Sequence, residues 1–433
     1  MKRFISILLI LCLSQSLSSC SHTISENFRD EYIASTDFQL NMEYDDLGFS
    51  TMTESDAAIY FIDGLYMYAI DKENLDVIPL CKKANCLHDK ETDPKSKASC
   101  EAFVGDGVKG IFYENHAIYV MTSGIADQVS TTSTTYSLRK YGQDGAFLET
   151  VYEFPSRPLA LIRHRNHIYY LRDHPVSTGE GSVKNASQLV EVSLITKEEK
   201  ILYTNDLENG TLSHLFAYGK HIYLRRMGNQ PDKMDSSPSE SYAEEIICFD
   251  LQNDSYTVLK PEEEGVIGTP MVYNNSLLYS YWFYNYTDDR NRLLYQSDLD
   301  GQNPNPFKKT AYTSSRQHWD QTYFYDDNWP LITIARLESV RQITVLDQQF
   351  NEIDKIDFTK IENNPDQIDF SGNDNPLRIS EQYIFLQGYG DNHQGSYLIC
   401  IDKAEIGTGN ITPRIIWQKE AQYQSEEYVL DTQ

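Results

Sequence analysis

Three cysteines and a histidine stand within twenty residues, "CKKANCLHDKETDPKSKASC" (81–100), of a chain that contains seven cysteines in all. Cys81, Cys86, His88 and Cys100 are separated by four, one and eleven residues. Three thiolates and an imidazole form a complete ligand set for tetrahedral zinc. The spacing is not that of a standard zinc finger. It nevertheless predicts a structural site for zinc, or another soft metal, that holds a loop together and leaves no open position for catalysis.

The same cysteines also suit a disulfide bond, and the choice depends on the compartment. Outside the cytoplasm, Cys86 or Cys81 would be able to oxidise with Cys100. Such a bond would leave one thiol unpaired and His88 without a role. The sequence leaves the metal and the disulfide interpretations both open.

The N-terminus predicts export and lipid attachment. Two basic residues precede an apolar run (4–13) that is too short to span a bilayer. Leu-Ser-Ser-Cys at 17–20 resembles the lipobox of bacterial lipoproteins, in which cleavage before the cysteine frees it for acylation. An ordinary secretory peptide is the competing interpretation. We expect an extracytoplasmic, membrane-anchored protein with a signal peptide (1–19), a lipidated Cys20 and flexible tether (20–37), and one folded domain (38–433).

The charge of the chain restricts its partners. It has 37 basic and 64 acidic side chains, and removal of residues 1–19 takes away two of the basic ones, which leaves a net charge of −29. Nucleic acid and anionic lipid surfaces would repel such a protein, so we expect neither as a broad partner. The membrane contact is then the lipid alone, and we expect the folded domain to be a monomer.

One hairpin pattern recurs along the domain: a short apolar strand, a tight turn with Asn, Gly or Asp, and an alternating strand rich in Ile, Leu and Tyr. Two further strands follow each copy, of which the third often ends in an acidic residue. Four antiparallel strands every 40 to 55 residues, without helix signals, predict an all-β protein and a β-propeller. We expect seven four-stranded blades, although six or eight also fit the pattern, with starts near 49, 109, 158, 212, 268, 320 and 376.

The ring is expected to close through a strand contributed by one terminus, either "FQLNMEY" (38–44) or "EEYVLD" (426–431). At "LYQSDLDGQNP" (294–304) the chain resembles the YWTD-type and TolB-like propellers. It is more similar to a domain of unknown function in lipoproteins of anaerobic Gram-positive bacteria. Those proteins carry a Cys-x4-Cys-x-His segment and a later Cys after the first blade, as residues 81–100 do here. The resemblance implies a propeller and no established activity.

Long connections between second and third strands are expected to gather on one face of the propeller, which favours that face for binding. Arginine and aromatic side chains at this rim suit an anionic or sugar-like ligand. Packing between blades and surface ion pairs are the competing explanation for these side chains. The residues proposed as ligand-binding are Arg172, Arg226, Trp282, Tyr284, Arg336 and Tyr389.

The sequence contains no recognisable catalytic motif, neither a nucleophile elbow nor a His-Glu-x-x-His zinc motif nor a phosphate-binding loop. We therefore predict a cell-surface binding module for a ligand or an envelope protein, without catalysis and without assigned catalytic residues. A propeller-type hydrolase or lyase acting on glycans or peptides is the alternative. An assembly component of the envelope is the third hypothesis.

Overall fold

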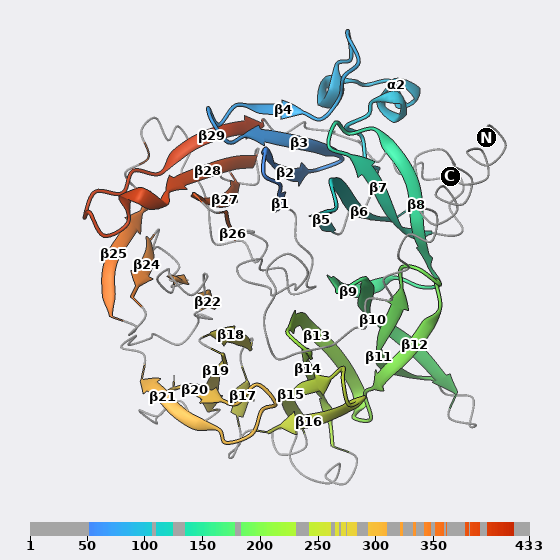
Figure 1. Ribbon diagram of the computed structural model, residues 1–433, viewed down its shortest axis with the longest axis vertical. Coiled ribbons are helices and arrows are strands. Elements are labelled where there is room, and N and C mark those ends of the chain that lie inside the picture. Colours follow the sequence, from blue (N-terminus) through green and yellow to red (C-terminus); the bar gives the residue numbers. More distant parts are fainter. Residues whose placement is uncertain are drawn as a thin grey trace, which may run out of the picture.

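The computed structural model describes residues 52–419 with gaps at 106–109, 124–134, 178–182, 231–241, 261–264, 268–269, 274, 284–292, 310–320, 324–331, 335–341, 348–350, 359–360, 362–376, 381 and 390–395. Its strands form seven antiparallel sheets that follow one another in chain order and stand around a common centre (Figure 1). This arrangement is a β-propeller, so the predicted fold class is confirmed.

The first four blades each consist of four strands that are consecutive in the chain. Blade 1 contains β1 (Met52–Glu54), β2 (Ala58–Asp63), β3 (Tyr66–Asp71) and β4 (Val77–Pro79). Blade 2 contains β5 (Gly110–Glu114), β6 (Ala117–Ser123), β7 (Tyr136–Gly142) and β8 (Phe147–Phe154). Blade 3 contains β9 (Pro158–His164), β10 (His167–Ser177), β11 (Val183–Ser193) and β12 (Glu199–Thr204). Blade 4 contains β13 (Glu208–Tyr218), β14 (His221–Asn229), β15 (Tyr242–Asp250) and β16 (Ser255–Leu259).

The last three blades follow the same order, except that the inner strand of blade 5 is in two pieces that both pair with β19. Blade 5 contains β17 (Gly265–Ile267), β18 (Met271–Tyr273), β19 (Ser276–Phe283), β20 (Leu293–Ser297) and β21 (Asn305–Lys309). Blade 6 contains β22 (Gln321–Tyr323), β23 (Ile332–Ile334), β24 (Gln342–Leu346) and β25 (Glu352–Asp357). Blade 7 contains β26 (Leu377–Ile379), β27 (Tyr383–Tyr389), β28 (Ser396–Asp402) and β29 (Arg414–Lys419).

The helices among the described residues are short and lie between strands: the 3-10 helix η1 (His88–Lys90), the α-helix α2 (Pro94–Ser99) and the 3-10 helix η5 (Lys403–Glu405). Across the part of the chain that the structure describes, no helix has the length and apolarity needed to cross a membrane.

The tight turns explain why the hairpin pattern predicted the blades so well. Asn115 and His116 join β5 to β6 with φ angles of 46° and 59°, and Arg165 and Asn166 join β9 to β10 with 49° and 67°. Two consecutive residues with positive φ match the right-handed twist of the flanking strands. Asparagine tolerates this conformation better than most residues, and it occurs in both turns. These turns fix the register of each blade's first two strands.

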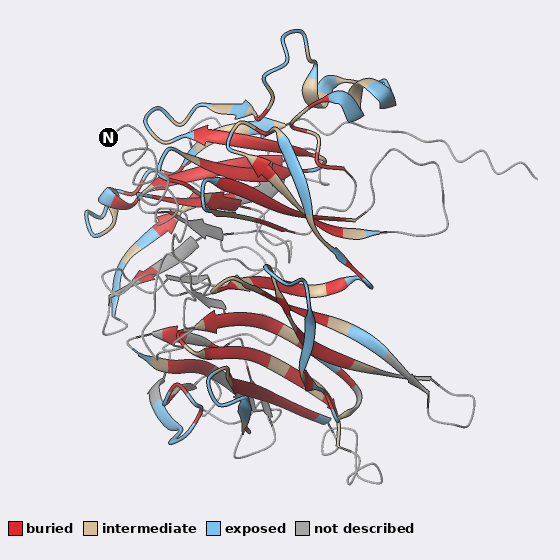
Figure 2. Ribbon diagram, turned by 45° about the vertical axis from the view of Figure 1, so that its right-hand side comes forward, coloured by how far each residue is buried: buried red, intermediate tan, exposed pale blue. Residues whose placement is uncertain are grey.

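The core lies between blades rather than within them. Middle strands are buried along most of their length, whereas outer strands expose many residues (Figure 2). Ile168, Tyr169, Tyr170 and Leu171 of β10 are all fully buried, because neighbouring blades cover both faces of the sheet. Phe147, on the outer strand β8, is 55% exposed. The alternation expected for a half-exposed sheet is therefore replaced by continuous apolar runs in the middle strands.

The structure bears on two expected features of the propeller, the long connection in blade 3 and the closure of the ring. Residues 174–187 fall in one of the long connections expected between second and third strands, but β10 and β11 continue through most of this stretch and pair from His167↔Ser193 to Ser177↔Val183. In blade 3 that expected connection is therefore mostly a long hairpin, because the backbones of β10 and β11 keep pairing beyond the apolar part of each strand. Both stretches proposed to close the ring, 38–44 and 426–431, lie outside the described residues, as do residues 1–37. Within the described residues, blades 1 and 7 each consist only of their own consecutive strands.

Candidate metal centre and seam pocket

The Cys/His stretch is a loop inserted into the outer edge of blade 1. Leu80, just after β4, donates its N–H to Met67 of β3, and the next residue along that edge is Ala102, whose carbonyl accepts from the Met67 N–H. Phe103 then pairs with Tyr66 in an antiparallel bridge. The chain therefore leaves the sheet at 80, runs through residues 81–100, and returns to it. The loop lies outside the ring, beside β4 and β8 (Figure 1).

Local structure brings the four donors together. Asn85 and His88 have φ angles of 66° and 53°, which turn the chain back on either side of Cys86. Asp93 caps α2 by accepting from the Ser96 N–H at 2.8 Å, and Pro94 occupies the first turn, where a missing N–H costs nothing. Helix α2 ends at Ser99, and the next residue, Cys100, places its thiol beside the other donors.

The donor atoms of Cys81, Cys86, His88 and Cys100 all lie within 4.8 Å of one another, and we call this group the Cys3His centre. A zinc ion about 2.3 Å from a thiolate and about 2.05 Å from an imidazole nitrogen, at the tetrahedral angle, separates the two donors by roughly 3.6 Å. Cys100 Sγ and His88 Nδ1 lie 3.6 Å apart. The three cysteines are free thiols in the structure. The donor set thus fits a tetrahedrally coordinated ion. This geometry supports the predicted metal site but does not assign the metal.

The thiols differ in acidity. Burial raises the pKa of Cys100 to about 12, and the neighbouring thiols Cys86 and Cys81 add to the rise. Burial would raise the pKa of Cys81 too, but hydrogen bonds from the backbone of Lys83 and Glu101 outweigh it and lower that pKa. A bound cation deprotonates its thiol ligands. Cys81 is therefore the thiol of this pair that gives up its proton more readily, and Cys100 would need a bound cation to do so.

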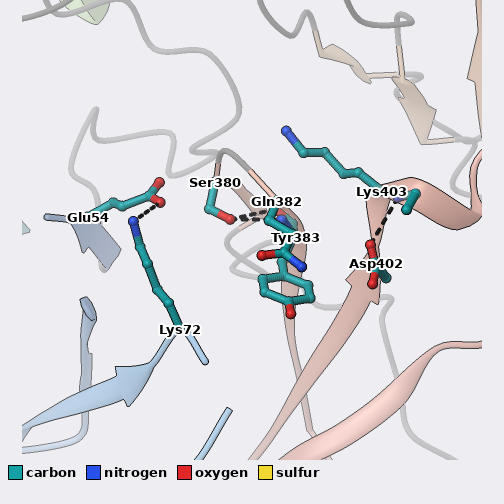
Figure 3. A pocket seen from close by; sticks show the side chains of 8 residues that line it. Glu54, Lys72, Ser380, Gln382, Tyr383, Asp402 and Lys403 are labelled. Carbon is teal, nitrogen blue, oxygen red and sulfur yellow. Dashed lines mark hydrogen bonds and ion pairs between the residues drawn. The ribbon is translucent and has the colours of Figure 1, made fainter. Parts of the chain in front are cut away.

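A pocket of about 420 Å³ lies at the junction of blades 1 and 7, which we call the seam. It opens between Glu54 and Lys72 of blade 1 and Ser380, Tyr383 and Lys403 of blade 7 (Figure 3). These residues lie at the ends of first and third strands. This edge of the blades is opposite the one that carries the Cys/His stretch 81–100, which we call the metal loop. The expected binding face carries the long connections, so this pocket is on the other side of the propeller.

Charged groups line this seam pocket. Lys72 Nζ lies 2.6 Å from Glu54, and Asp402 accepts from the Ala404 N–H at 2.9 Å. Lys403 and Ser380 are each only 2% exposed. Sequence reasoning missed the pocket, although a signal was present: the third strands of blades 1 and 7 both end in Ile-Asp-Lys, at 70–72 and 401–403. Because the two blades adjoin, the repeated lysine recurs on both sides of one seam.

Two of the proposed rim residues are engaged by acidic neighbours. Arg172 donates to Gln188 and to Tyr170 and lies 3.1 Å from Glu199. Arg226 is 8% exposed at its side chain and contacts several groups of blades 3 and 4, namely Tyr203, Asp206 and Glu245. These contacts fit the competing explanation, packing between strands and blades. Trp282 and Tyr389 lie in β19 and β27, and Tyr284 and Arg336 lie outside the described residues, as does Cys20.

No family model and no curated protein matches this chain. Solved structures with a similar fold include an oligogalacturonate lyase from Vibrio parahaemolyticus, with a TM-score of 0.47, 10% identity, and coverage of 88% of this chain and 90% of the lyase. The β-propeller domain of the Trilobed protease from Pyrococcus furiosus has a TM-score of 0.41 and 12% identity. This match covers 70% of this chain and 79% of the protease domain. A puromycin-hydrolyzing peptidase from Mycobacterium tuberculosis has a TM-score of 0.49 and 12% identity. The match covers 90% of this chain and 57% of the peptidase. At such identities the similarity concerns the fold alone.

Proposed function

We propose that this protein is a lipid-anchored, extracytoplasmic propeller that binds a small carboxylate-bearing ligand at the seam pocket, with a structural zinc at the Cys3His centre. The observation that carries the binding proposal is the pocket with Lys72 and Lys403 on its two sides. An ammonium group has three N–H donors, and the salt bridge to Glu54 uses one of those of Lys72. A ligand carboxylate is the group that accepts from the remaining donors.

Titration calorimetry of the full chain, purified in detergent, tests the binding proposal. The probes are a uronic-acid disaccharide and a dipeptide, which share a carboxylate and differ in everything else. We expect at least one to bind, and Lys72→Met and Lys403→Met to weaken it by about tenfold or more. Lys200→Met is the matched control, because this lysine is exposed and pairs with Asp254 in blade 4. Binding that survives both pocket substitutions would exclude this site.

Metal analysis combined with thiol counting tests the Cys3His centre. The mature lipidated chain retains Cys81, Cys86, Cys100, Cys248 and Cys400, since its lipid blocks Cys20. We expect one zinc per chain and all of these thiols to react after chelation under denaturing conditions without reductant. Two fewer reactive thiols and no metal would instead establish a disulfide. Soft thiolates select zinc over harder cations such as manganese.

The anchor is tested by labelling cells with an alkyne fatty acid. We expect the label on the wild-type chain and its loss in Cys20→Ser, together with a shift of the protein from the membrane fraction to the medium. Label on the Cys20→Ser chain would contradict the proposed lipoprotein processing.

A propeller-type hydrolase or lyase remains the second candidate. The similar solved structures include enzymes named as a lyase and as peptidases, and this chain spans about half the length of the peptidase. That similarity carries no catalytic residue to this chain. Incubation with oligogalacturonate and with peptide mixtures, followed by mass spectrometry, decides between the two, because turnover would identify an enzyme and unchanged substrate favours the binding module.

A further inference from the structure

The metal loop reaches from blade 1 to blade 7. Asp89 directly follows the ligand His88, and Lys419 Nζ at the end of β29 lies 3.8 Å from its carboxylate. The same ammonium lies 3.1 Å from Asp63, the last residue of β2. Asp63 also accepts a hydrogen bond of 2.9 Å from the hydroxyl of Ser396, the first residue of β28. One lysine of the last blade is therefore placed between the metal loop and the first blade.

These charges are largely removed from water. The side chains of Lys419 and Asp89 are each 21% exposed, and that of Asp63 is 9% exposed. Such pairs are screened less than fully exposed ones, which contribute little. Burial raises the pKa of Tyr68 on β3, and the carboxylates of Asp89 and Asp63 raise it further, so both lie close to this strand.

Beneath the charges, the Cys3His centre joins the apolar layer of the seam. Trp417 of β29 packs against Phe61 and Tyr68 of blade 1, with ring centroids 5.6 and 5.2 Å apart. The same cluster includes residues of both blades and all three cysteines of the centre: Met52, Ile59, Phe61, Tyr66, Tyr68, Cys100, Ala102, Tyr383, Phe385, Leu398 and Cys400, with Cys81, Cys86 and Trp417 packed against it. The centre thus forms one end of the contact between the first and last blades.

The loop contains little regular secondary structure, and hydrogen bonds such as that from the Lys82 N–H to Glu101 and that from Lys83 to the carbonyl of Ser99 contribute to its shape. Its elements are η1, which spans three residues and buries none of them, and α2, which spans six. So short a helix is not stable by itself. Ordering the backbone costs about 1–2 kcal/mol per residue, which a loop without its own core must offset by other bonds. Coordination by the four donors would supply such bonds and would hold the backbone at His88, and with it the neighbouring Asp89, in place.

We propose that the metal loop is a latch for the propeller ring: an ion at the Cys3His centre holds Asp89 against Lys419 and so closes the seam between blades 1 and 7. The proposal rests on the metal centre proposed above and extends its role from a loop to the whole ring. Within the described residues each of these two blades consists of its own strands, and the contacts described between them are made by side chains such as Lys419, Asp63 and Trp417. The latch supplies a contact that depends on the metal.

Hydrogen exchange of the zinc-loaded full chain in detergent, read by mass spectrometry, tests the latch. We expect chelation to raise exchange at least about tenfold in β2, β3, β28 and β29, while β9, β10, β13 and β14 remain unchanged. Asp89→Asn keeps every metal ligand, and we expect it to raise exchange at the seam about fivefold with zinc still bound. Glu91→Gln is the matched control, because its carboxylate accepts from the nearby N–H groups of Thr92 and Asp93.

The outcomes separate the latch from the metal centre. Zinc binding without any change at the seam on chelation, and with Asp89→Asn exchanging like the wild type, would overturn the latch and leave the centre in place. A rise in exchange over all blades would also overturn the latch, because the ion would then stabilise the entire fold. A chain that binds no metal would overturn the centre and the latch together.

Discussion

The junction between blades 3 and 4 and the seam between blades 7 and 1 solve the same packing problem with different means. At the former, the chain runs directly from β12 to β13, and Asn205 in that connection donates to the carbonyls of Thr211 and Met227 of blade 4. His164 of blade 3 is hydrogen bonded to the carbonyl of Gly219 at 2.8 Å. A covalent connection keeps the two blades at high effective concentration. At the seam the described residues contain no such connection, and the loop 81–100 contributes the contact of Asp89 with Lys419.

The difference has a consequence for stability. Junctions within the chain can open only locally, since their blades stay tethered, whereas opening the seam exposes two whole blade faces. The seam has three parts. The ion pair of Lys419 and Asp89 lies at one edge of the blades, the pocket lies at the other edge, and an apolar layer lies between them. Substitutions at the two junctions therefore measure how much the stability of each one depends on buried charge.

The largest effect is expected from Arg226→Met at the junction of blades 3 and 4. This substitution leaves Glu245, 3% exposed at its side chain, without its closest cation, although Lys260 remains 3.1 Å away. Removing one partner of a buried pair costs about 3–5 kcal/mol, and we expect the lower end here. The free energy of unfolding in urea measures it, with Lys260→Met as control. An effect no larger than that of the control would show that the buried pair is dispensable.

Trp417→Ala is the corresponding change at the seam. Removing a fully buried aromatic side chain costs about 3–5 kcal/mol, and Trp417 is half-buried, so we expect roughly 2 kcal/mol. Hydrogen exchange should rise in β2 and β3, which the indole contacts, more than in β10 or β14. Exchange that rises evenly in all these strands would mean that the seam does not open separately.

Much of this comparison was accessible from the sequence, and the reasons are physical. Tight turns such as Asn115–His116 have strict backbone requirements, so the hairpin pattern located each blade start within a few residues. The residues of the Cys3His centre were recognised because few side chains can bind soft metals. Contacts between distant segments leave no such local pattern. Lys419 and Asp89 are unremarkable in the sequence, and only the closure of the ring places them together.

The rim arginines illustrate the same limit. Their position at strand ends was predicted, but the pattern could not tell a ligand from the neighbouring carboxylates of Glu199 and Glu245 as their partner. For the seam pocket, the paired Ile-Asp-Lys sequences would have sufficed once blades 1 and 7 were known to adjoin.

A smaller effect is expected from Lys419→Met, which keeps the packing of the side chain and removes its charge. Asp63 retains the hydrogen bond from Ser396, so the cost should be about 1 kcal/mol. In a chain that already carries Asp89→Asn and Asp63→Asn, Lys419→Met should cause no further loss of unfolding free energy. A double-mutant cycle measures this difference. Additive losses would show that the lysine acts on neither carboxylate.

The smallest effect concerns pH and lies away from the seam, at the end of β15. Burial alone would raise the pKa of Asp250, but hydrogen bonds from Asn253 and the ammonium of Lys220, 3.1 Å away, outweigh it and lower that pKa. A carboxyl with a lowered folded-state pKa stabilises the protein above its unfolded pKa, and this contribution is lost as the pH falls through the folded value. We expect Asp250→Asn to cost less than about 1 kcal/mol at pH 7, because water screens the half-buried pair, and the difference from the wild type to shrink on acidification. Urea unfolding at several pH values checks the sign, with Asp254→Asn as the exposed control. A difference that grows at low pH would reverse the assignment and make burial the dominant influence on this carboxyl, as it is for the raised pKa of Glu244 on the same strand.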